Sequence, residues 1–272
     1  EPMIFVRDKG RMCNNLLQYG HLYAWGREHG RSTMSMRFAY KYPYFHICKT
    51  AHHNFATYLF AKYAAKWKLI PTVSFNEENA DTSVQQSEML HHSMILAEGW
   101  YARFPELFIK YKEEIKQLFA FLPPITAKIE TELSVYGEDT LLLGVHIRRG
   151  DYATWQGGKY LFDDAQYLSI IRQFIALHAD KKVEVFICGN DPKLDRQQYI
   201  DVLGATVHFP CGNPGEDICL LSHCDYLIGA PSTFTLVASM YHDTPLYWIK
   251  DASAPLLISS FGYFDDLFRK II

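Results

Sequence analysis

The sequence lacks the features that mark several common classes of protein. It has no continuous apolar stretch of about 18 residues, the length at which a membrane-spanning helix is predicted. Its first residues show no secretory pattern, and the N-glycosylation acceptor Asn-x-Ser/Thr is absent. We therefore expect a soluble, intracellular protein.

An excess of charge of one sign is also missing. The chain has 27 Lys and Arg against 30 Asp and Glu, which gives a net charge of −3. No general basic field is available to attract nucleic acid or an anionic membrane, so we expect no nucleic-acid partner and at most peripheral membrane contact. Any anion must be bound locally.

Metal and nucleotide motifs are absent as well. The six cysteines form no C-x-x-C pair, and the cluster Cys219, His223 and Cys224 lies in a segment whose apolar spacing already predicts a packed helix. The chain has no G-x-G-x-x-G, G-x-x-x-x-G-K-S/T, H-E-x-x-H or Asp-x-Asp motif. We expect no metal site, and a nucleotide's charge would have to be met by arginines and helix ends.

What the sequence does contain is an alternation of strand and helix patterns. With 272 residues, 49% of them hydrophobic, it is long enough for two compact domains. The first half predicts strands at 3–6, 33–38, 70–75 and 94–100, helices at 16–29, 54–67 and 104–121, a loop at 76–87, and a further helix from 123 to 136. The second half alternates more regularly, with strands at 141–147, 183–188, 205–209, 226–229 and 245–249 and helices at 165–178, 193–202, 215–223 and 232–242. This order predicts an α/β protein with parallel, Rossmann-like sheets.

Residues 141–152, LLLGVHIRRGDY, form the stretch most informative about chemistry. An apolar run without strict alternation predicts a parallel strand buried on both faces, and it ends in a histidine and two arginines. Side chains alternate along a strand, so His146 and Arg148 should share one side, and Ile147 and Arg149 the other. One arginine can then clamp a pyrophosphate while the other braces, and Asp151 either holds an arginine or acts on a substrate hydroxyl. A purely structural ion pair is the alternative.

Three other places carry candidate ligand groups. Ser232 and Thr233 stand at a predicted helix N-terminus, where hydroxyls and amides either cap the helix, bind phosphate, or do both. Asp217, at the start of the preceding helix, either caps it or accepts two N–H donors from a guanine edge. Asn14 and Asn15 either cap the first long helix or present amides to a ligand.

The segment His146-Ile-Arg-Arg-Gly-Asp151 resembles the H-x-R-R-x-D motif of fucosyltransferases, most closely the α-1,2-fucosyltransferases of glycosyltransferase family 11. The segment GRMCNNLLQY at 10–19 is similar to that family's G-R-x-G-N-Q-L-x-Q-Y. Further similar segments are GWYARF at 99–104, FICGND at 186–191 and DICLLSHCD at 217–225. These landmarks span nearly the whole chain in the family's order.

The resemblance implies a GT-B fold, two Rossmann-like domains with parallel sheets facing a cleft. It implies an acceptor-side domain at 1–138 and a GDP-fucose-binding domain at 139–272. By position, Arg148 would contact the β-phosphate, His146 and Asp217 the guanosine, and Ser232 and Thr233 the diphosphate. The donor-binding set implied by the matched segments also includes Arg149, Asn190, Phe234 and Arg11. Arg148, Asp151 and Asn14 form the catalytic set.

The implied reaction is metal-independent, inverting transfer of L-fucose from GDP-fucose to a galactoside hydroxyl, with α-1,2 linkage. Arginine and helix dipoles would stabilise departing GDP while the fucose ring develops oxocarbenium character. APSTFTLVA at 230–238 replaces the family's tryptophan-containing pattern, which leaves another linkage such as α-1,6, or another GDP-sugar, as an alternative. A non-catalytic nucleotide- or glycan-binding module is the alternative from a different class. The resemblance further implies a bacterial cytoplasmic enzyme, at most peripheral to the inner membrane, that builds a surface glycan such as lipopolysaccharide or capsule.

Overall fold

A computed structural model describes residues 1–271 of the chain. The chain divides into two compact units, Glu1–Leu122 and Pro123–Ile272. Helix α6 (Pro123–Leu133) contacts α9 (Pro214–Ser222) and so belongs with the second unit, whereas the sequence-based division kept residues up to 138 in the first.

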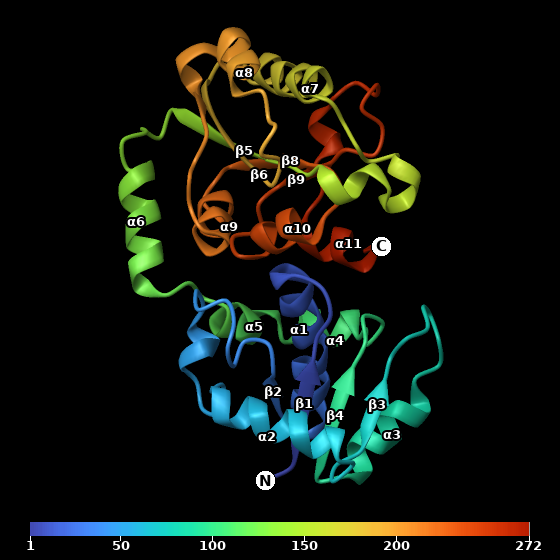
Figure 1. Ribbon diagram of the computed structural model, residues 1–272. Coiled ribbons are helices and arrows are strands. Elements are labelled where there is room, and N and C mark those ends of the chain that lie inside the picture. The colour runs from blue at the N-terminus through green and yellow to red at the C-terminus, as the bar shows by residue number, and fades with distance from the viewer. Residues whose placement is uncertain (272) are drawn as a thin grey trace. The chain divides into compact units, whose positions relative to one another are not determined.

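The first unit is built on a four-stranded parallel sheet in the order β2-β1-β4-β3 (Figure 1). The strands are β1 (Met3–Arg7), β2 (Ser32–Ser35), β3 (Thr72–Ser74) and β4 (Met94–Glu98). The helices are α1 (Met12–His29), α2 (Phe55–Lys66), α3 (Ser83–His91), α4 (Pro105–Lys110) and α5 (Lys112–Leu118). One core cluster joins β1 and β4 to α2, through Met3, Phe5, Leu96, Ala61 and Ala64.

The second unit is built on a five-stranded parallel sheet in the order β7-β6-β5-β8-β9. The strands are β5 (Thr140–Ile147), β6 (Lys182–Gly189), β7 (Val207–His208), β8 (Tyr226–Gly229) and β9 (Leu246–Trp248). Besides α6 and α9, the helices are α7 (Asp164–Leu177), α8 (Arg196–Leu203), α10 (Thr233–Met240) and α11 (Phe264–Arg269). Both sheets are parallel, which confirms the predicted fold class.

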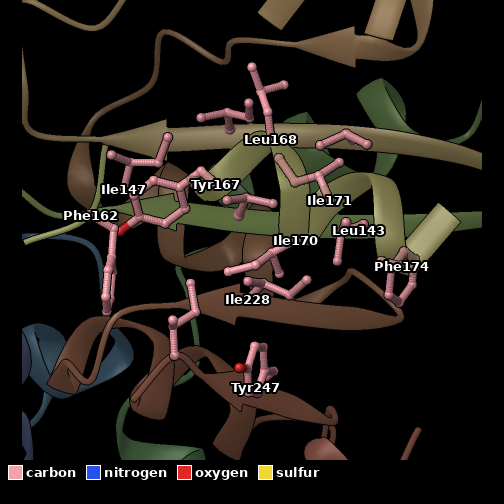
Figure 2. Close-up of a cluster of buried hydrophobic side chains, with 14 of the residues drawn as sticks. Leu143, Ile147, Phe162, Tyr167, Leu168, Ile170, Ile171, Phe174, Ile228 and Tyr247 are labelled. Carbon is pink, nitrogen blue, oxygen red and sulfur yellow. The ribbon is translucent and has the colours of Figure 1, made fainter. Parts of the chain in front are cut away.

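Strand β5 is the middle strand of this sheet, and side chains cover both of its faces. Leu143, Val145 and Ile147 are fully buried in a cluster with α7, and Figure 2 shows Ile147 close to Phe162 and Tyr167. Each side chain of this kind contributes about 1.5–3 kcal/mol when buried. On the other face a Cβ at Gly144 would come within 2.7 Å of Leu221 and Leu227 side-chain atoms. The missing side chain therefore lets α9 pack close to β5.

Most predicted elements are present, with three differences. The stretch predicted as a loop at 76–87 contains the start of α3, which the Asp81 carboxylate stabilises by accepting a hydrogen bond from the Ser83 amide at 3.0 Å. The predicted helix at 104–121 is two helices, because the backbone leaves helical geometry at Tyr111. Helix α1 begins at Met12 rather than Leu16, directly after a turn at Gly10 with φ of +86°.

Candidate active site

The carboxyl ends of β5, β6 and β8 meet at one edge of the second sheet. His146 is paired with Cys188 and Gly229, and Ile147 with Gly189. The segments that follow these three strands therefore start from neighbouring points. Ligands of open α/β sheets bind at this kind of edge.

Arg148 and Asp151 form an ion pair at this edge. The Arg148 Nη2 donates to Asp151 Oδ2 at 2.9 Å and its Nε approaches Oδ1 at 3.3 Å. The guanidinium also lies 5.1 Å from the centre of the Tyr152 ring. Of the two roles left open for Asp151, this geometry fits the one of holding an arginine.

All three nitrogens of the Arg149 guanidinium donate hydrogen bonds to protein groups. It donates to Asp164 at 2.6 Å, to Asp191 at 3.3 Å and to the Phe162 carbonyl at 3.1 Å, and its side chain is only 13% exposed. It also lies over the Tyr167 ring, on the Ile147 side of the strand, as the alternation predicts. Asn190 accepts a hydrogen bond from the Arg149 amide at 3.2 Å. Both residues, predicted to bind the donor, are seen bracing the loop that carries Arg148.

His146 lies on the opposite face of β5, against α10. Its ring stacks on Phe234, with centroids 4.4 Å apart and planes 15° from parallel. Burial, with a smaller effect from the charge of Arg148, lowers the pKa of His146 to about 3, so the imidazole is neutral. Its Nδ1 is buried and has no hydrogen-bond partner among the residues described. A buried nitrogen in that state favours a ligand group that completes its hydrogen bonding.

Ser232 caps α10. Its hydroxyl accepts a hydrogen bond from the Phe234 amide at 3.2 Å, and Thr233 is the first helical residue. Tyr152, from the loop after β5, donates to the Pro231 carbonyl just before the cap. The capping interpretation of Ser232 is therefore correct. This hydrogen bond from Tyr152 joins the N-terminus of α10, the positive end of the helix dipole, to the loop that carries Arg148.

Asp217 is not a cap, and that alternative was wrong. Asn213 caps α9, with a reciprocal bond between its amide and Glu216, and Asp217 stands one residue further along. The Asp217 Oδ1 is buried without a hydrogen-bond partner among the described residues. Burial, with help from Glu216, raises the pKa of Asp217 to about 7. Helix α9, which begins just before Asp217, packs against β5, the strand that carries His146.

The predicted residues of the first unit lie at the start of α1. Arg11 is the N-cap residue but makes no side-chain capping bond, and Asn14 is in the first turn. Gly10 has φ of +86°, which L side chains rarely adopt, so the turn needs glycine there. The buried Asn15 donates to the Lys9 carbonyl at 3.1 Å. Neither asparagine is the helix cap, so the capping interpretation was wrong.

Sequence reasoning missed Asp8, which follows β1. The side chain is 3% exposed, its Oδ1 has no partner among the described residues, and burial raises its pKa well above the usual range. The signal that could have found it is a carboxylate that directly follows a largely buried strand.

Within residues 1–271 no group of three or more His, Cys, Asp or Glu side chains could hold a metal ion. His223 Nδ1 instead lies 2.7 Å from the Cys219 carbonyl. The described helices include none with the length and apolarity needed to cross a membrane.

The model of glycosyl transferase family 11 matches residues 108–243, which is half of the chain and includes β5, α9 and α10. The chain belongs to glycosyl transferase family 11. This confirms the family predicted from the sequence, and with it the class of enzyme. No curated protein matches the chain.

Several solved structures share the fold of this family 11 protein. POFUT1 in complex with GDP-fucose is 13% identical, with a TM-score of 0.61 over 89% of this chain and 94% of that one. NodZ α-1,6-fucosyltransferase soaked with GDP-fucose is 15% identical, with a TM-score of 0.56 over 96% and 97%. An Arabidopsis thaliana FUT1 mutant in complex with GDP is 11% identical, with a TM-score of 0.61 over 96% and 74%. At these identities the likeness establishes the GT-B-like fold.

Proposed function

We propose that this protein transfers L-fucose from GDP-fucose to a galactoside hydroxyl of a glycan, forming an α-1,2 linkage with inversion and without a metal ion. The donor is inferred from Arg148 and His146 at the edge of the second sheet and from Asp217 on α9, the helix that packs against β5. Arg148, which Asp151 holds in position, has a guanidinium that fits the oxygens of a diphosphate. The buried Oδ1 of Asp217, without a hydrogen-bond partner among the described residues, belongs to a carboxylate that can accept the two N–H donors of guanine. The structural neighbours named above were solved with GDP-fucose or GDP, which supports the same donor.

In this proposal the bond between fucose C1 and the β-phosphate oxygen breaks, and its electron pair stays on GDP. Arg148, the positive end of α10 and the hydroxyls of Ser232 and Thr233 stabilise that growing charge. An acceptor oxygen bonds to C1 from the opposite face, and its hydroxyl proton passes to solvent water. Asp151 keeps Arg148 in position.

An α-1,6 linkage is the specific alternative to the α-1,2 linkage. NodZ, whose fold covers nearly all of this chain, is an α-1,6-fucosyltransferase. The α-1,2 assignment depends on the resemblance of the sequence to family 11 motifs, so the product must be examined directly.

The test is turnover of the purified protein with GDP-fucose, EDTA and a panel of galactose-terminated acceptors, followed by NMR of the product. An α-1,2-fucosylated product is expected. Arg148→Ala should abolish turnover and weaken GDP binding, whereas Arg172→Ala, an exposed arginine on α7, should leave both unchanged. An α-1,6 product would overturn the linkage, and loss of turnover in EDTA would overturn metal independence. GDP binding with no product from any acceptor would favour the non-catalytic module, and no GDP binding would overturn the donor.

A further inference from the structure

Basic charge is concentrated in one segment of the first unit. Residues 29–76 contain seven Lys and Arg and no Asp or Glu. The rest of the chain has 20 Lys and Arg against 30 Asp and Glu. A protein with a net charge of −3 therefore has one continuous segment of 48 residues with a charge of +7. That segment includes the whole of α2 (Figure 1).

A surface helix usually turns its large apolar side chains toward the core, and helix α2 does the opposite. The face toward the sheet carries small residues, with Ala61 fully buried and Ala64 4% exposed. Its outer face carries aromatic residues. We define the α2 face as the large apolar side chains exposed on α2 and the loops beside it, namely Tyr40 (44%), Phe55 (56%), Phe60 (50%), Tyr63 (36%), Trp67 (65%) and Leu69 (74%).

Ring contacts join these side chains in two groups along the helix. Tyr40 contacts Phe55, with ring centroids 6.5 Å apart, and Tyr63 contacts Trp67 at 5.3 Å. Soluble monomers seldom expose large contiguous apolar patches unless something binds there. The α2 face therefore calls for a partner.

Lysines flank the aromatic residues on the same helix. Lys62 Nζ lies 5.5 Å, and Lys66 Nζ 5.8 Å, from the centre of the Tyr63 ring. Lys68 follows directly after Trp67, and all three lysines are exposed. On a helical wheel Lys62 and Lys66 lie along one border of the exposed arc, while Phe60 and Trp67 lie toward the other. Helices that rest in a membrane interface combine Trp, Phe and Leu with lysines whose long stems let the charge stay at the headgroups.

We propose that the α2 face is a docking surface for an anionic lipid bilayer. The aromatic residues enter the headgroup region and the lysines pair with lipid phosphates. The charge of the segment favours an anionic lipid surface over a second copy of this chain, because a second copy would bring the same +7 segment against itself. The proposal is independent of the donor and of the linkage.

The test is co-sedimentation of the full chain with vesicles. We expect binding to vesicles of equal parts phosphatidylcholine and phosphatidylglycerol, weakening with salt, and little binding to phosphatidylcholine alone. Each basic side chain near an anionic surface contributes roughly a factor of five, so Lys62→Gln/Lys66→Gln/Lys68→Gln should lower the partition coefficient about a hundredfold. Lys181→Gln/Lys193→Gln/Lys270→Gln removes the same charge from exposed positions of the second unit and should change it little.

Trp67 supplies a second, independent readout. Trp67→Phe should keep vesicle binding but lose a blue shift in tryptophan fluorescence that the wild type shows with anionic vesicles. Trp67→Ser should weaken binding, and Ile258→Ser, a side chain of similar exposure in the second unit, should not. Thermal melting checks that each variant is folded.

Equal binding of the two triple-lysine variants would overturn the proposal, as would absence of wild-type binding to anionic vesicles. Sedimentation that reveals a dimer dissociated by Trp67→Ser, without vesicle binding, would assign the α2 face to a second copy and also overturn it.

Discussion

Asp217 allows the donor site to be tested through pH. Burial raises the pKa of its carboxyl to about 7 in the protein without ligand. Guanine offers two N–H donors, which bind the ionised carboxylate and not the protonated acid. The affinity for the donor should therefore rise with pH up to about 7 and then level off.

The size of the effect follows from the fraction ionised. With a pKa of about 7, roughly one molecule in eleven is ionised at pH 6 and ten in eleven at pH 8, so affinity should differ about tenfold, or ~1.4 kcal/mol. Calorimetry with GDP-fucose is the suitable assay, because a terminal phosphate such as that of GDP has its own pKa near 6. At pH 6 binding should also release close to one proton, visible as a dependence on the buffer's ionisation enthalpy.

Asp217→Asn is the matched variant. It removes the titrating group and sets an amide N–H against a donor of guanine, so the donor should bind about a hundredfold more weakly at pH 8, with no pH dependence between 6 and 8. Discrimination between GDP and ADP should fall at the same time. A wild type with constant affinity from pH 6 to 8, or an Asn variant with the same pH profile, would refute the assignment of Asp217 to guanine.

Three further predictions concern Arg148, Arg149 and Asp8. Arg148→Lys keeps the charge but loses the planar fork, so kcat should fall about a hundredfold or more while the melting temperature changes little; unchanged kcat would contradict the diphosphate clamp. Arg149→Ala leaves two partly buried carboxylates unpaired and should cost about 3 kcal/mol in the free energy of unfolding, measured with urea; a loss of donor affinity at full stability would instead make Arg149 a ligand. Because the pKa of Asp8 is raised in the folded state, the folded protein keeps a proton on this carboxyl that the unfolded chain releases above about pH 4. The protonated carboxyl therefore favours the folded state at low pH, and this stabilisation is lost as pH rises. Asp8→Asn should therefore gain stability over wild type at neutral pH and not at pH 4, in thermal melts at both values.

Membership of glycosyl transferase family 11 and the order of the elements could be predicted because they depend on local patterns. The apolar run before His146 predicted a buried strand, and alternation along that strand separates Ile147 and Arg149 from His146. The cap of α9 was also readable in principle. Asn213 followed by a proline and then Glu216 is a capping box, and it would have excluded Asp217 from that role.

The roles of individual polar groups required the tertiary structure, because their partners are far away in the sequence. Two equivalent arginines follow β5, and the sequence alone does not say which one braces. The distinction depends on Asp164 and Asp191, 15 and 42 residues further along, which bind Arg149.

The burial of polar groups likewise depends on segments that are distant in the sequence. The neutral imidazole of His146 and the raised pKa of Asp217 come from desolvation by neighbours brought in from α10 and around α9. On α2, helical periodicity was visible in the sequence, but only packing against the sheet determines that alanines face inward and Trp67 faces outward. The sequence by itself determined most of the strands and helices, and the family. The fold decided which charges are paired, which are buried, and which aromatic side chains remain exposed, because these depend on contacts between distant segments.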